Sequence, residues 1–156
     1  MGYLNSFELK GYITVKTEDI LTGEKKVVYD GPNLIVDLGI ANIILSLSTI
    51  AGGHPVNRIG VGVSSTSVAS SDISLEPAGG YLFSTTNQEI GVSNDLVTYT
   101  TLVPADTSGI PSGTELREVG LILENDALFA RQVIPTVTKT NNIAITIEWR
   151  VSCSVD

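Results

Sequence analysis

The sequence predicts a mainly β fold, an antiparallel β-sandwich of about seven or eight strands with one buried α-helix near residues 34–50. Three observations lead to this prediction. Short runs of alternating apolar and polar residues recur along the chain, with turn-forming residues between them. One longer segment is apolar around most of a helical circumference. The 156 residues contain no internal repeat or linker, so we expect a single domain over residues 1–156.

Strict alternation predicts strands at both ends of the chain. From Phe7 to Lys16 apolar residues alternate with polar ones, which indicates a strand with one face in water. Residues 17–23 resemble a turn and residues 25–30 a returning strand, which Gly31-Pro32-Asn33 should end. Between residues 143 and 155 the alternation is clearest, and it places Trp149 and Cys153 on the apolar face.

Residues 34–50 are predicted to form a helix, because their apolar side chains fill two adjacent helical stripes and leave little polar surface. Asn33 is placed to cap its start, and Gly52-Gly53 to end it. A helix of this kind is normally buried. We expect it to pack in the core against the sheet, with a helix at a subunit seam as the alternative.

Short strands are predicted through the middle of the chain, at residues 57–63, 81–90 and 96–103. The first contains Gly60-Val61-Gly62, but a dinucleotide-binding fingerprint would need a third glycine and a following helix. These glycines instead favour close packing or a bulge. Residues 104–113 are rich in Pro, Gly, Ser and Asp, and are predicted to form an exposed loop.

Two apolar runs that meet at Asn125-Asp126 predict a β-hairpin over residues 115–134. If these two residues form the loop, positions that sum to 251 face each other across the strands. Leu123 then faces Leu128, and Gly120 faces Arg131.

In this register Arg131 lies diagonal to Glu118, at a separation where side chains pair. The pair is either an ordinary exposed ion pair of little energetic value, or a half-buried pair that fixes the hairpin in a sandwich or at a subunit contact. Glu118, Gly120 and Arg131, with Trp149 of the last strand, are the candidate structural and assembly residues.

Composition narrows the possible partners. The formal charge is −8, and residues 59–116 hold six acids and no base, so nucleic-acid binding is disfavoured. No apolar run approaches the roughly 20 residues of a membrane span. Only 17% of residues are charged, where about 25% is typical, and the mean hydropathy is +0.25. We therefore expect no membrane partner and a chain that hides surface in an oligomer.

The sequence offers little for catalysis or cofactors. One cysteine and one histidine exclude an internal disulfide and a Cys/His zinc cluster. His54 has no catalytic partner at a recognisable spacing, and the acids follow no calcium-loop pattern, so we read them as solvated loop acids. We expect no catalytic, cofactor-binding or metal-binding residues. The N-terminus lacks the features of a signal peptide, which predicts synthesis in the cytosol.

Across residues 27–151 the order of several short motifs resembles that of small structural proteins of tailed-phage virions. The motifs are Asn33-Leu34-Ile35-Val36-Asp37-Leu38-Gly39-Ile40, Ile59-Gly60-Val61-Gly62, Ser71-Asp72-Ile73-Ser74-Leu75, Leu116-Arg117-Glu118-Val119-Gly120-Leu121, Leu128-Phe129-Ala130-Arg131, Thr138-Lys139-Thr140 and a closing strand around Trp149. This chain has Gly62-Val63-Ser64 where such proteins usually have Gly-Thr-Gly, and Asp72-Ile73-Ser74-Leu75 where Asp-Thr-Ala-Leu is usual.

The resemblance implies a non-enzymatic, multicopy component of the virion, in the tail, baseplate, neck or collar, or fibre attachment. Its partners would be copies of itself and other virion proteins. The alternative is a receptor- or carbohydrate-binding β-sandwich. Sugar sites usually need exposed aromatic residues, and this chain has nine aromatics, several of them predicted to face the core. Tyr12, Tyr81 and Tyr99 remain available for such a site.

Overall fold

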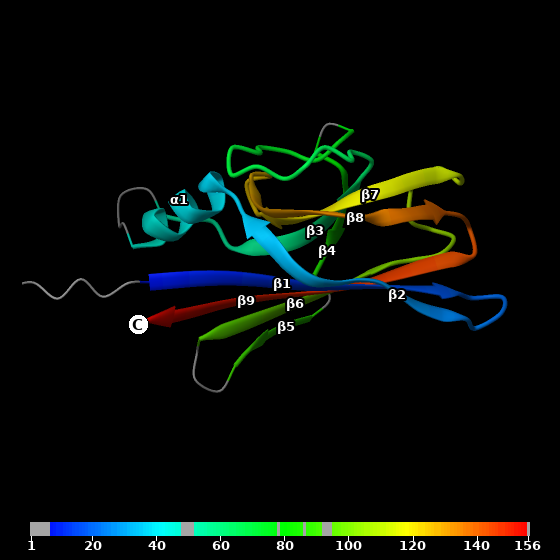
Figure 1. Cartoon of the computed structure of the whole chain (residues 1–156), viewed down its shortest axis with the longest axis horizontal. Coiled ribbons are helices and arrows are strands. Elements are labelled where there is room, and N and C mark those ends of the chain that lie inside the picture. The colour runs from blue at the N-terminus through cyan, green and yellow to red at the C-terminus, as the bar shows by residue number, and fades with distance from the viewer. Residues whose placement is uncertain (1–6, 48–51, 78, 86, 92–94, 156) are drawn as a thin grey trace, which may run out of the picture.

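The computed structural model describes residues 7–47, 52–77, 79–85, 87–91 and 95–155, which form strands joined by loops and one short helix (Figure 1). In chain order these are β1 (Phe7–Asp19), β2 (Lys25–Ile35), α1 (Asp37–Ser46), β3 (Val56–Gly62), β4 (Tyr81–Ser84), β5 (Asn87–Ile90), β6 (Leu96–Val103), β7 (Thr114–Leu123), β8 (Leu128–Lys139) and β9 (Ile143–Val155). The prediction of a mainly β fold with one helix is confirmed.

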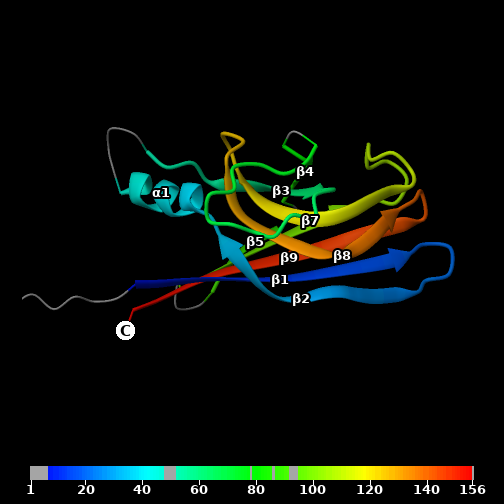
Figure 2. The same cartoon turned by 45° about the horizontal axis from the view of Figure 1, so that its top comes forward.

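The nine strands of the described residues form one antiparallel sheet in the order β4-β3-β7-β8-β2-β1-β9-β6-β5. This sheet curls into a half-barrel, so that β3, β7 and β8 lie over β1, β9 and β6 (Figure 2). The Thr101 hydroxyl of β6 donates a 2.9 Å hydrogen bond to the Ser84 carbonyl of β4, close to where the two ends of the sheet approach each other. The predicted sandwich of seven or eight strands is wrong, because there is one sheet instead of two.

Strand β2 joins the two halves of the sheet. Its residues 25–33 pair with β1, and its last two residues, Leu34 and Ile35, pair with β8. Gly31-Pro32-Asn33 was predicted to end this strand, but the strand continues through it. Because one strand passes from one half to the other, the two halves cannot form as separate sheets.

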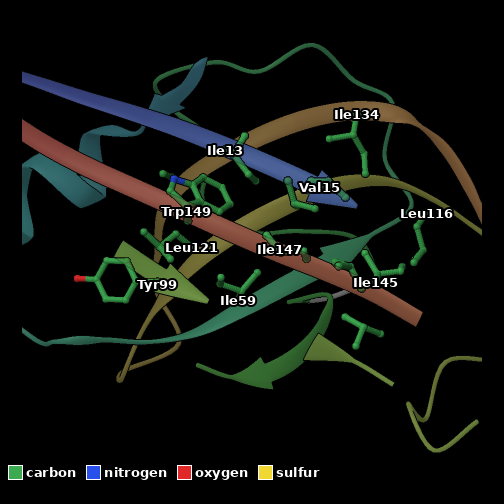
Figure 3. Packing of buried hydrophobic residues seen from close by; sticks show 14 of the residues in the cluster. Ile13, Val15, Ile59, Tyr99, Leu116, Leu121, Ile134, Ile145, Ile147 and Trp149 are labelled. Carbon is green, nitrogen blue, oxygen red and sulfur yellow. The ribbon is translucent and has the colours of Figure 1, made fainter. Parts of the chain in front are cut away.

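The concave face of the sheet carries the main hydrophobic core. Figure 3 shows side chains of β1 and β9 gathered with those of β3, β6, β7 and β8. In β9, Ile145, Ile147 and Trp149 are buried while Thr146 between them is exposed, so the predicted alternation is confirmed. Cys153 is half-buried near the end of the same strand.

Helix α1 is shorter than predicted and is not a core helix. It begins at Asp37 after the N-cap Val36, and residues 48–50 of the predicted helix lie outside the described residues. Asn33, the predicted cap, remains in β2. Only Gly39 and Asn42 of the helix are buried. The prediction of burial is wrong because the strands' own side chains fill the concave interior, which leaves the helix against β8 at one end of the half-barrel (Figure 1).

The β7–β8 hairpin follows the predicted register over residues 118–121, where Gly120 faces Arg131. Nearer the turn the register shifts by one residue, so that Ile122 pairs with Leu128. The predicted pairing of Leu123 with Leu128 is therefore wrong. The bulge turns Leu128 to the convex side of the sheet, where it packs with Ile122 in a second, smaller apolar cluster.

Residues 104–113 are less exposed than predicted. Ala105 and Ile110 are buried, and the buried ammonium group of Lys139 donates a 2.6 Å hydrogen bond to the Ala105 carbonyl. Burial lowers the pKa of Lys139, while Asp106 opposes that shift. A lysine from β8 thus anchors a loop that composition alone predicted to be free in solvent.

Candidate assembly surfaces and the buried ion network

Glu118 of β7 and Arg131 of β8 form an ion pair on the convex side of the sheet. Arg131 Nε lies 2.7 Å from Glu118 Oε2, and the two side chains are 4% and 0% exposed. The sequence offered an exposed pair or a half-buried one, and the structure shows a fully buried pair. The difference arises because the segment between β3 and β4 covers it.

This covering segment is held by the same two side chains. Glu118 Oε1 accepts hydrogen bonds from the Ser64 N–H at 3.2 Å and the Glu76 N–H at 2.7 Å. The Arg131 guanidinium donates to the Thr66 carbonyl at 3.0 Å and to Asp72 at 2.8 Å. Buried charges are tolerated when they are paired and hydrogen-bonded in this way. The network therefore fastens residues 64–76 to the sheet.

Asp72 was predicted to be a solvated loop acid, and this is wrong. Its side chain is 22% exposed and pairs with Arg131. Partial burial alone would raise the pKa of Asp72, but the hydrogen bond from the Ala69 N–H and the Arg131 guanidinium together hold that pKa below its ordinary value. Burial would likewise lower the pKa of Arg131, but Glu118 and Asp72 raise it above its ordinary value.

Leu75 of the covering segment packs into a shallow depression floored by glycines. A Cβ added to Gly60 would lie 2.7 Å from Leu75 Cδ1, and one added to Gly120 would lie 3.0 Å from both of its methyl groups. A Cβ on Gly62 would overlap the Glu118 carboxylate. The close packing predicted for Gly60-Val61-Gly62 is confirmed, and it leaves room for both Leu75 and the ion pair.

None of the four residues predicted from the sequence as structural or assembly candidates lies on the surface. Glu118, Gly120 and Arg131 come together beneath the covering segment, whereas Trp149 lies fully buried in the main core. These residues can influence assembly only by stabilising the fold that presents the surface.

His54 lies beside α1 and has a structural partner. The buried carboxamide of Asn42 accepts a 2.8 Å hydrogen bond from the His54 N–H and donates a 2.9 Å bond to the His54 carbonyl. The imidazole is half exposed, and its Nδ1 lies 3.9 Å from a carboxylate oxygen of Glu124. Asn42 thus fastens the helix to the connector before β3.

The exposed half of α1 is an apolar surface. Leu38, Ile40, Ile44 and Leu45 are exposed, as is Leu47 just beyond the helix, and Ile44 is 63% exposed. A groove beside the helix is bordered by Leu38, Ala41, Asn42, Leu45, Gly52, His54, Leu123 and Asn125. We call the five exposed apolar residues the helix surface. Apolar groups gathered in this way on one element mark interaction sites more often than isolated ones do.

A second apolar surface lies at the β1–β2 turn. Ile20 and Leu21 are exposed at the turn, Leu21 to 74%, and Val27 is exposed on β2. Exposed lysines accompany them at positions 25 and 26. We call Ile20, Leu21, Lys25, Lys26 and Val27 the tip surface. The turn lies at the opposite end of the half-barrel from α1 (Figures 1 and 2).

The tyrosines considered for sugar binding differ in their surroundings. Tyr99 is buried and Tyr81 is half-buried, so neither offers an open ring face. Tyr12 is exposed beside a groove on the convex side of the sheet, but the Arg150 guanidinium lies 4.7 Å from its ring centroid and covers one face. Only Tyr12 of these three remains available for stacking.

Within the described ranges, no three His, Cys, Asp or Glu side chains are grouped so that they could bind a metal ion. The same part of the chain contains no helix with the length and apolarity needed to cross a membrane. No protein-family model matches the chain, and neither does any curated protein or solved structure.

Two parts of the site were missed from the sequence. Asp72 lies 59 residues from its partner Arg131 and has no local pattern that would link them. The tip surface was also missed, although the exposed Ile20-Leu21 pair stands in the part of the predicted turn that is a turn in the structure. The prediction of a turn over residues 17–23 is wrong at its start, because β1 continues to Asp19. The two apolar residues in a predicted turn were the signal from which the tip surface could have been predicted.

Proposed function

We propose that this chain is a non-enzymatic structural component of a tailed-phage virion, in the tail, baseplate, neck or collar, or fibre attachment, and that it acts by multicopy assembly. The observation that carries the proposal is the helix surface, an apolar face on the outside of a domain whose buried charges are paired or hydrogen-bonded internally. Such a face favours an interaction site, because covering it removes apolar area from water.

The motifs behind the resemblance coincide with the parts that build this scaffold. Residues 116–121 and 128–131 carry the buried ion pair, residues 71–75 supply Asp72 and Leu75, and residues 59–62 supply the glycines beneath them. A shared order of scaffold positions supports a common architecture rather than common chemistry. This is what a family of building blocks with varied surfaces would retain.

The receptor- or carbohydrate-binding alternative has less support. It depends on Tyr12 alone among the three tyrosines considered, and that ring already packs on Arg150. Binding of this kind would be revealed by a glycan array in which signals disappear for the Tyr12→Ala variant.

The proposal is tested on particles of a phage that encodes this chain. Purified virions, banded by density and washed in high salt, should contain the chain in several copies by quantitative mass spectrometry, and an antibody should label one defined part of the particle. A non-structural protein of the same phage is the control for contamination. A chain that is made during infection but absent from washed particles would contradict the proposal.

A further inference from the structure

We propose that copies of this chain join head to tail, with the tip surface of one copy packed on the helix surface of the next. The inference rests on the proposed multicopy function and names the contact that would produce it. Both surfaces expose apolar side chains, and each occurs at one end of the half-barrel.

The position of the two surfaces excludes a contact within one chain. In both views α1 lies at one end of the long axis and the β1–β2 turn at the other, with the length of β1 between them (Figures 1 and 2). β1 pairs with β9 along all of its 13 residues, so the turn cannot fold back onto the helix. The tip surface can therefore meet a helix surface only on a second copy.

Lysines at the turn end can meet carboxylates at the helix end of a neighbour. Lys16, Lys25 and Lys26 border a groove beside the turn, together with Glu18, which lies 3.9 Å from Lys25. The Asp19 carboxylate accepts hydrogen bonds from the Leu21 and Thr22 N–H groups of the turn, so Lys16 and Lys26 are the cations best placed to meet acids of a neighbour.

At the other end of the half-barrel, Asp37 is the first residue of α1. Glu124 and Asp126 lie in the β7–β8 turn, directly after Leu123, which borders the groove beside the helix. Asp126 already pairs with Arg58, which leaves Asp37 and Glu124 as the acids best placed to meet the lysines of a neighbour. Lysines facing carboxylates favour this pairing over contact between two like ends.

A contact between two different surfaces is heterologous, so every copy uses its tip surface to contact one neighbour and its helix surface to contact another. Copies joined in this way form a closed ring when the rotation per copy divides a full turn, and a filament when it does not. An isologous contact, helix surface on helix surface, would instead stop at a dimer.

Complementary variants test this directly. Leu21→Asp damages only the tip surface, and Ile44→Asp only the helix surface. Both residues are highly exposed, so the variants should retain the wild-type melting temperature. We expect each variant alone to sediment as a monomer and an equimolar mixture to form a one-to-one dimer, because each variant keeps the end that the other lacks. Ile90→Asp, which is equally exposed on β5, is the matched control and should assemble like the wild type.

Disulfide trapping tests which two surfaces meet in the contact. In a Cys153→Ser background, Leu21→Cys combined with Ile44→Cys should give a ladder of linked oligomers, while either cysteine alone should not. Dimers from Ile44→Cys alone, or a mixture of the two aspartate variants that stays monomeric, would overturn the head-to-tail contact. If the head-to-tail contact is overturned but the chain is abundant in washed virions, the proposed function still stands. If the chain forms head-to-tail oligomers but is absent from virions, only the proposed function is contradicted.

Discussion

The contacts of Arg131 could be predicted from the sequence only in part. Its facing partner Gly120 and its pairing with Glu118 follow from hairpin register, and both were predicted. Its burial and its bonds to Thr66 and Asp72 depend on a segment that folds back from residues distant in the chain. Local pattern determines which side chains share a strand face, but not what covers that face.

Removing the charge of Arg131 should lower the stability of the fold. Arg131→Met would leave Glu118 buried without its cation, and we expect the free energy of unfolding to fall by about 3–5 kcal/mol. Arg117→Met is the matched control, because Arg117 pairs with Glu115 at the surface, where such a pair contributes about 0–1 kcal/mol. Urea unfolding of both variants checks the prediction. Equal losses would show that the buried network does not hold the covering segment.

The depressed pKa of Asp72 predicts a stability difference that depends on pH. An acid whose pKa is lower in the folded state stabilises that state above its unfolded pKa, and this contribution is lost as the pH falls through the folded value. Wild type should therefore exceed Asp72→Asn in unfolding free energy at neutral pH, and the gap should narrow below pH 3.8, the ordinary value. Urea titrations from pH 7 to pH 2 measure it. A gap independent of pH would show that the Asp72 charge is not involved.

Gly120 should not tolerate a larger side chain. The register places Gly120 opposite Arg131, but Leu75 and Leu128 lie closest to a Cβ added at this position, both at 3.0 Å. We expect Gly120→Val to lower stability by about 1–3 kcal/mol through overpacking, and to cost less when it is introduced into a Leu75→Ala background. Gly52→Val, which has nothing within 4 Å, is the control. An unchanged melting temperature for Gly120→Val would contradict this packing.

Among the elements, the buried face of β9 was predicted correctly, whereas the burial of α1 was not. Alternation with period two states directly which face of a strand is buried, and β9 has the longest uninterrupted alternation. The apolar character of α1 was visible, but apolar residues only show that a surface needs a partner. They do not say whether that partner belongs to the same chain.

The two faces of β9 should respond differently to truncation. Trp149→Ala removes a fully buried indole, and we expect a loss of about 3–5 kcal/mol. Thr146→Ala, on the exposed face of the same strand, should change stability by no more than about 0.5 kcal/mol. Thermal and urea unfolding compare them. Similar losses for both would mean that β9 is buried on both faces, as in an assembly that also covers its outer side.

At the scale of the whole molecule, the strand content was predictable but the single curled sheet was not. Whether β2 ends at Gly31-Pro32-Asn33 or continues to Ile35 decides between two sheets and one. That choice depends on pairing with β8, which lies about a hundred residues further along. Turn signals are read locally, and here tertiary pairing overrides them.

The low charge content and the exposed helix surface together predict self-association at the level of the whole chain. Burial of the helix surface would give the contact its main stabilisation, and the charges around it would add a smaller component that salt screens. Association should therefore weaken in high salt without disappearing.

Sedimentation velocity of the purified full-length chain at micromolar concentration, in low salt and again in high salt, tests this central claim most directly. The account predicts oligomers in low salt that grow with concentration and decrease, but persist, in high salt. A soluble monomer at every concentration and in both salt conditions would contradict it, because the helix surface would then be stable in water without a second copy.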